Sequence, residues 1–161
     1  MNSNKTYTKW DVALATGFYS GYSPFAPGTM GALIATLIWF VGYFCLDYTC
    51  LQIVTSVAIF VFTLLSIPSI DRLEKVWGED PSRVVVDEMV GVWISLLAVP
   101  ADGHWGYIVG AFVLFRLFDI VKPLGVRRME RIGGGWGVML DDILAGVYGA
   151  IVLFFINMLL Q

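Results

Sequence analysis

Two pairs of adjacent carboxylates stand at the start of apolar segments in this chain. Asp87 and Glu88 occur in SRVVVDEMVG, and Asp141 and Asp142 occur in GGGWGVMLDDILAG. A further acid, Asp119, lies near the end of another apolar segment, in FRLFDIVKP. Carboxylates beside hydrocarbon lose hydration and repel one another, and a bound divalent cation offsets both costs. Because the available donors are oxygen atoms, the pattern favours hard Mg²⁺ over zinc.

Helical spacing indicates which member of each pair faces the neighbouring helices. Small residues lie three, four and seven positions after Asp142, at Ala145, Gly146 and Gly149. Glu88 is likewise followed by small residues on its own face, whereas Asp87 and Asp141 lead to bulkier faces. We therefore expect Glu88 and Asp142 to bind the metal directly. Asp87 and Asp141 are then supporting or alternate ligands.

Two basic residues and a proline-containing loop accompany the acids. Arg116 and Lys122 flank Asp119, and the loop GYSPFAPGTMGAL contains Gly28 and Thr29. Gly28 permits close approach of the backbone, and Thr29 can cap the helix that follows. A helix N-terminus attracts anions, so the loop predicts a phosphate contact. An alternative to the phosphate contact stays open, in which the loop is only a capped helix start. An alternative to the metal site also stays open, in which Arg116 pairs with Asp119 and the acid pairs stabilise helix N-termini.

Five apolar segments must position these groups. They run over residues 30–46, 51–67, 84–100, 105–122 and 138–160. Several have about 17 residues, or about 26 Å of helix, which is the short end of what crosses a bilayer. The composition, 58% hydrophobic and only 14% charged, also indicates a membrane protein. Before these segments, residues 8–19 mix apolar and charged side chains, as a helix at the membrane interface does.

The sequence therefore predicts a single all-α domain over residues 1–161. Its fold is a multi-helical integral membrane bundle of about five transmembrane helices, preceded by an interfacial helix. The alternatives are that one segment is a buried or re-entrant helix, and that the whole chain is a soluble helical fold. A net charge of −3 and the lack of a basic stripe exclude nucleic acid as an expected partner.

The distribution of cations predicts the orientation of this bundle. With five spans, all ten Lys and Arg side chains, from Lys5 onward, fall at the end where the acid pairs lie. The opposite end has Asp47, Asp102 and His104 but no Lys or Arg. The positive-inside rule then places the N-terminus and the acids on the cytoplasmic side.

Four motifs resemble those of a known family. SPFAPGTMG, VVVDEMVG, FRLFDIVKP and GGGWGVMLDDILAG, in this order, are similar to the motifs of the phosphatidylglycerophosphatase A family. The resemblance covers about residues 10–152 and departs at Ala32, where the family often has Ser. It implies a bacterial inner-membrane, multi-pass, Mg²⁺-dependent phosphatase. Such an enzyme removes the terminal phosphate of phosphatidylglycerophosphate, a lipid, and gives phosphatidylglycerol and phosphate.

The residues and the resemblance together predict metal-assisted hydrolysis. The expected catalytic set is Asp87, Glu88, Asp119, Asp141 and Asp142. Of these, Glu88, Asp119 and Asp142 are expected to hold Mg²⁺. The groups expected at the substrate are Gly28, Thr29, Arg116 and Lys122, with the two cations neutralising charge in the transition state. A remaining carboxylate could act as general base or as a nucleophile that forms an aspartyl-phosphate, and the sequence leaves both open.

Other phosphatase chemistries lack their motifs in this sequence. There is no Cys-x5-Arg loop and no Asp-x-Asp-x-Thr motif, and the sole histidine, His104, falls at the opposite end of the bundle. The competing hypothesis is a non-enzymatic carrier of a small cation. A carrier would place its acids near the bilayer midplane with access from both faces.

Overall fold

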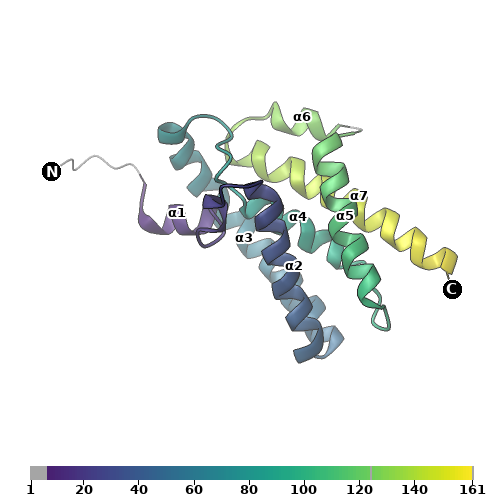
Figure 1. Cartoon of the computed structure of the whole chain (residues 1–161). Helices are drawn as coiled ribbons and strands as arrows, with labels where there is room; N and C mark the ends of the chain where they lie inside the picture. Colours follow the sequence, from purple (N-terminus) through teal and green to yellow (C-terminus); the bar gives the residue numbers. More distant parts are fainter. Residues whose placement is uncertain (1–6, 124, 161) are drawn as a thin grey trace.

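The computed structural model describes residues 7–123 and 125–160. Every regular element in these residues is a helix, which confirms the predicted all-α class. The elements are α1 (Lys9–Ala15), η1 (Ser20–Tyr22, a 3-10 turn), α2 (Pro27–Cys45), α3 (Tyr48–Trp77), α4 (Val86–Leu96), α5 (Trp105–Val121), α6 (Val126–Glu130) and α7 (Gly134–Leu160). Helix α4 lies at the centre, and α2, α3, α5 and α7 pack around it (Figure 1).

Three helices of the described chain, α2, α3 and α7, are long and apolar enough to cross a membrane. Of the five predicted spans, those at residues 30–46, 51–67 and 138–160 thus fall on helices that could cross a membrane. Helix α5 has 17 residues, about 26 Å, and falls at the short end of a span.

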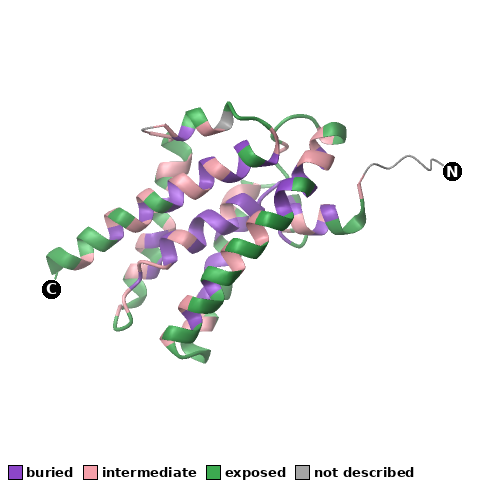
Figure 2. Cartoon of the chain, turned by 180° about the vertical axis from the view of Figure 1, so that it is seen from behind, coloured by how far each residue is buried: buried purple, intermediate pink, exposed green. Residues whose placement is uncertain are grey.

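The predicted span at residues 84–100 is instead a buried helix. Helix α4 has only 11 residues, about 16 Å, whereas the hydrocarbon core of a bilayer is about 30 Å thick. It is buried along most of its length, while the outer faces of α2 and α7 are exposed (Figure 2). The sequence misled here because a continuous apolar run has the same pattern in a span and in a helix enclosed by others. The alternative of a buried helix is the correct one for this segment.

Small residues allow α4 and α7 to pack with their backbones in contact. A Cβ added to Gly146 would lie 2.3 Å from the carbonyl oxygen of Gly91, and one added to Gly149 would lie 2.4 Å from Ser95 Oγ. The Ser95 hydroxyl donates to the carbonyl of Gly146 at 2.9 Å. The small face predicted after Asp142 is thus the face that meets α4.

Gly146→Ala should destabilise the protein by about 1–3 kcal/mol, because its methyl group has no space against the α4 backbone. Gly106→Ala is the matched control, since an added Cβ there meets nothing within 4 Å. The measurement is the melting temperature of each variant in the same detergent. Equal melting temperatures for the two variants would contradict this account of the α4–α7 contact.

The two ends of the bundle differ in charge. At one end, the Tyr43 hydroxyl donates to the carbonyls of Ala101 and Gly103 at 2.9 and 3.0 Å, which joins the last turn of α2 to the loop between α4 and α5. At the other end α2, α4 and α7 begin and α3 and α5 finish, and we call it the basic end. Every Lys and Arg of the described residues lies at or near the basic end; Lys5 is outside the described residues.

Candidate active site

Three carboxylates from two helices meet at the basic end. Asp87 and Glu88 lie in the first turn of α4, and Asp142 lies two turns into α7. One carboxylate oxygen from each lies within 4.8 Å of the other two. We call Asp87, Glu88 and Asp142 the acid trio. It combines both members of the first predicted pair with the predicted inward member of the second.

The acid trio has buried oxygen atoms that nothing in the described chain satisfies. Asp87 Oδ1, Glu88 Oε2 and Asp142 Oδ1 are inaccessible to solvent and have no hydrogen-bond partner among the described residues. A buried polar atom left without a partner costs about 1–3 kcal/mol, and neighbouring carboxylates also repel one another. Converging carboxylate oxygens of this kind suit a hard divalent cation such as Mg²⁺. The residues present therefore fit a metal.

The other predicted acids form ion pairs beside the acid trio. Arg116 Nη1 donates to Asp119 Oδ2, as the alternative reading of the sequence expected. Lys122 Nζ donates to Asp141 Oδ2 at 2.8 Å. The predicted metal ligands were Glu88, Asp119 and Asp142; the structure brings Asp87 into the trio and pairs Asp119 with a cation.

Gly28 lies directly behind one acid of the trio. A Cβ at Gly28 would stand 1.9 Å from Glu88 Oε1, so only glycine leaves room for the carboxylate.

The predicted cap by Thr29 is wrong: α2 begins at Pro27, Ala26 is the N-cap residue, and no side chain caps the helix. Proline suits the first position of a helix, and this starts α2 before Thr29. Thr29 is the third residue of α2 and is half-buried.

A cavity of about 480 Å³ opens beside the acid trio. Its lining includes the whole acid trio together with Asp119, Lys122 and Asp141. Gly28, Thr29 and Arg116 do not line it. The cavity also has polar lining residues that no sequence motif predicted, namely Glu74, Glu79, Asp80 and Arg131. They lie at or beyond helix ends outside the four motifs, where no spacing pattern identifies them.

Comparisons with known proteins agree with the motifs. A family model described as phosphatidylglycerophosphatase A matches residues 13–157. A Bacteroides thetaiotaomicron protein with the provisional name phosphatidylinositol-3-phosphatase is 59% identical over 143 residues, which cover 88% of this chain and 90% of that protein. No solved structure matches the chain.

Two further relatives are named phosphatidylglycerophosphatase A. The Escherichia coli protein is 39% identical over 95% of this chain and 86% of its own length. The Haemophilus influenzae protein is 38% identical over 89% of this chain and 86% of its own length. The family model and these relatives span nearly the whole chain, including all four motifs and the acid trio, and so the chain belongs to the phosphatidylglycerophosphatase A family.

Proposed function

We propose that the protein is a Mg²⁺-dependent lipid phosphatase that hydrolyses the terminal phosphate monoester of phosphatidylglycerophosphate, giving phosphatidylglycerol and phosphate. The observation that carries the proposal is the acid trio: one oxygen of each carboxylate lies within 4.8 Å of the other two, and all three residues line a polar cavity. Each also has a buried oxygen with no partner among the described residues. Two relatives that align over most of the chain are named for this activity.

In this proposal the acid trio holds the metal, with Asp119 at the cavity wall beside it. When bound, Mg²⁺ polarises the phosphoryl oxygens and offsets negative charge that develops in the transition state. Lys122 is held at the same wall by Asp141, where its ammonium group neutralises charge on the phosphate. Arg116, oriented by Asp119, adds positive charge close to the site.

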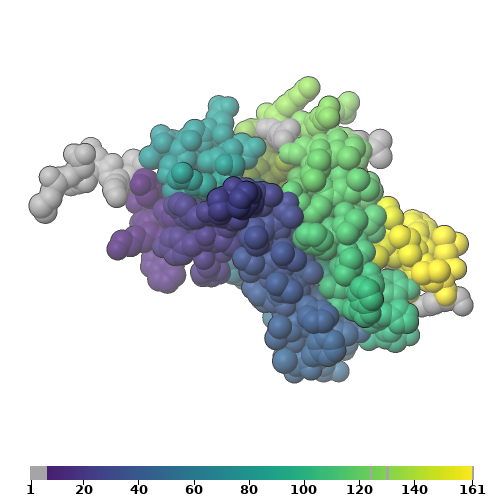
Figure 3. All heavy atoms as spheres, in the orientation of Figure 1, coloured from purple at the N-terminus to yellow at the C-terminus, as the bar shows by residue number. Residues whose placement is uncertain are grey.

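The position of the site in the bundle favours a phosphatase over a cation carrier. The described residues that line the cavity all lie near the basic end, whereas a carrier needs access from both ends. On the face shown in Figure 3, α2 and α5 lie side by side, and apolar side chains of both line a groove between them. In this proposal the acyl chains remain in lipid while the headgroup reaches the cavity. By the positive-inside rule, the excess of cations at this end supports a site on the cytoplasmic side of a bacterial inner membrane.

Purified protein should release phosphate from phosphatidylglycerophosphate in mixed micelles only when Mg²⁺ is present. Removal of the metal with EDTA should abolish the release, and added Mg²⁺ should restore it. The same assay with phosphatidylinositol-3-phosphate tests the lipid for which the Bacteroides relative is named. Faster release from that lipid would reassign the substrate, and Mg²⁺ binding without release from any lipid would favour the carrier.

A further inference from the structure

The last turns of α3 hold the start of α7. Asp71 Oδ1 accepts a hydrogen bond from the backbone N–H of Gly135 at 2.7 Å. A Cβ at Gly134 would lie 2.8 Å from the same carboxylate oxygen, and one at Gly135 would lie 2.3 Å from the carbonyl oxygen of Ile67. An aspartate of one helix thus satisfies a free N–H group in the first turn of another, as an N-cap residue does.

This contact fixes the part of α7 that carries the site. Asp142 follows Gly135 by seven residues, which is two helical turns and about 10.5 Å along the axis. The two residues therefore lie on one face of α7. Holding Gly135 against α3 sets both the axial position and the rotation of the helix at Asp142.

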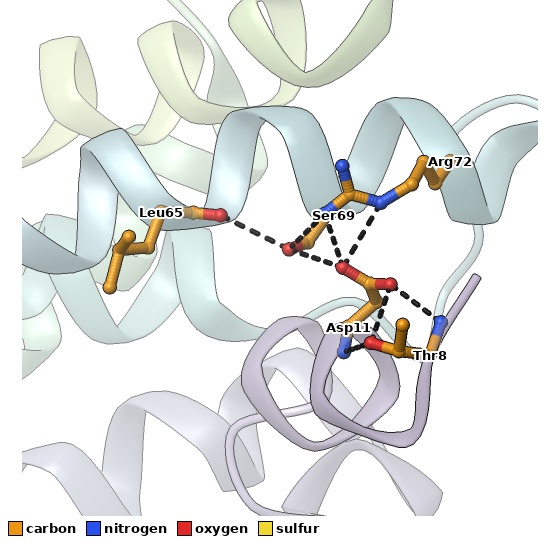
Figure 4. A network of polar contacts seen from close by, with 5 residues as sticks. All are labelled: Thr8, Asp11, Leu65, Ser69 and Arg72. Carbon is orange, nitrogen blue, oxygen red and sulfur yellow. Dashed lines mark hydrogen bonds and ion pairs between the residues drawn. The ribbon is translucent and has the colours of Figure 1, made fainter.

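The same turns of α3 also hold α1, through the buried carboxylate of Asp11 (Figure 4). Asp11 Oδ1 accepts from Ser69 Oγ at 2.9 Å and forms an ion pair with Arg72. Asp11 Oδ2 accepts from the backbone N–H and the hydroxyl of Thr8 at 2.6 and 2.8 Å. Burial raises the pKa of Asp11, but the hydrogen bonds from Arg72, Thr8 and Ser69 outweigh it and hold the pKa well below its usual range. Asp11 is therefore ionised at neutral pH, where its carboxylate attaches α1 to α3.

Helix α1 in turn holds the start of α4. The carbonyl of Ala15, the last residue of α1, accepts from the Val85 N–H at 2.9 Å. Val85 is fully buried. A Cβ added to Gly31 of α2 would lie 2.7 Å from the Cβ of Val85. Val85 immediately precedes α4, so its position sets that of Asp87 and Glu88 in the first turn.

We propose that Asp71 and the Asp11–Arg72 pair are positioning residues that attach α7 and α1 to adjacent residues of α3, and thereby set the separation of Asp142 from Asp87 and Glu88. None of the three lines the cavity, so each acts through the backbone that it holds. Substitution of a residue that orients metal ligands from outside the site typically lowers the affinity for the metal by about 10- to 100-fold. The inference rests on the proposed function in one respect, that the acid trio binds Mg²⁺.

Asp71→Ala tests the attachment of α7. We expect the Mg²⁺ concentration for half-maximal phosphate release to rise about tenfold, with the KM for lipid nearly unchanged. Mg²⁺ binding should also raise the melting temperature, and we expect the variant to need about tenfold more Mg²⁺ than the wild type for the same rise. Asp71→Asn keeps an acceptor oxygen and should restore both values, and Asp71→Ser is the milder variant if Asp71→Ala does not fold. Asp11→Asn should shift both values in the same direction as Asp71→Ala.

Asp47→Ala is the matched control. Asp47 accepts from the N–H groups of Thr49 and Cys50 at 3.0 and 3.4 Å, and so caps the start of α3 at the opposite end of the bundle. Its loss should lower stability without changing either Mg²⁺ response. If Asp71→Ala responds to Mg²⁺ as the wild type does, or if Asp47→Ala shifts the response equally, the positioning proposal is wrong.

The thermal measurement needs no lipid and so separates the two proposals. A wild-type protein that Mg²⁺ stabilises but that releases no phosphate from any lipid refutes the proposed function, and the positioning proposal is then decided by the melting temperatures. A wild-type melting temperature that does not respond to Mg²⁺ overturns the positioning proposal directly.

Discussion

Glu88→Gln should lower kcat/KM for phosphate release on the order of 10³-fold, while the protein still folds and inserts into membranes. The substitution keeps the size of the side chain but removes the charge and one carboxylate oxygen. Glu88 Oε2 is buried without a partner in the described chain, and the side chain stands within 4.8 Å of Asp87 and Asp142. The measurement is phosphate release from phosphatidylglycerophosphate over a range of Mg²⁺ concentrations.

Thermal unfolding of the same variant has an expected direction as well. Because one of three repelling carboxylates is removed, Glu88→Gln should melt no lower than the wild type when Mg²⁺ is absent. It should also lose most of the stabilisation that Mg²⁺ gives. Glu79→Gln is the control, since Glu79 lines the same cavity outside the acid trio. Near-normal activity in Glu88→Gln, or an equal loss in Glu79→Gln, would remove the acid trio from the mechanism.

Gly28→Ala should lower phosphate release by about 10²-fold, because a displacement of about 1 Å at a catalytic group can cost that much. The added Cβ would stand 1.9 Å from Glu88 Oε1, and so the carboxylate must leave its position. Gly106→Ala, whose Cβ meets nothing within 4 Å, controls for the addition of a methyl group to a helix.

A second substitution distinguishes a displaced carboxylate from general damage to α2. Glu88→Asp shortens the side chain by one methylene group and so draws the carboxylate back from the new methyl group. The double variant Gly28→Ala, Glu88→Asp should therefore recover the melting temperature lost in Gly28→Ala without recovering activity. Wild-type activity in Gly28→Ala would show that the contact with Glu88 does not position the carboxylate.

The sequence alone determined the properties that follow from local pattern. An apolar composition with few charges predicted the all-α class, and the four motifs predicted the family that the comparisons support. Helical spacing also predicted the inward member of the second acid pair, because the small residues after Asp142 must face whatever packs closely against α7. This last inference needs only neighbours within about two helical turns.

Tertiary structure alone decided which apolar segment is enclosed and which groups converge. Residues 84–100 resemble a span, yet α4 is short and buried, because the surrounding helices replace lipid as its apolar environment. The fold, and not the spacing, brought Asp87 into the acid trio and paired Asp141 with Lys122. Asp71 meets Gly135 across 64 residues of sequence. A contact at that separation leaves no periodic signal, because it depends on how whole helices pack and not on the residues beside either partner.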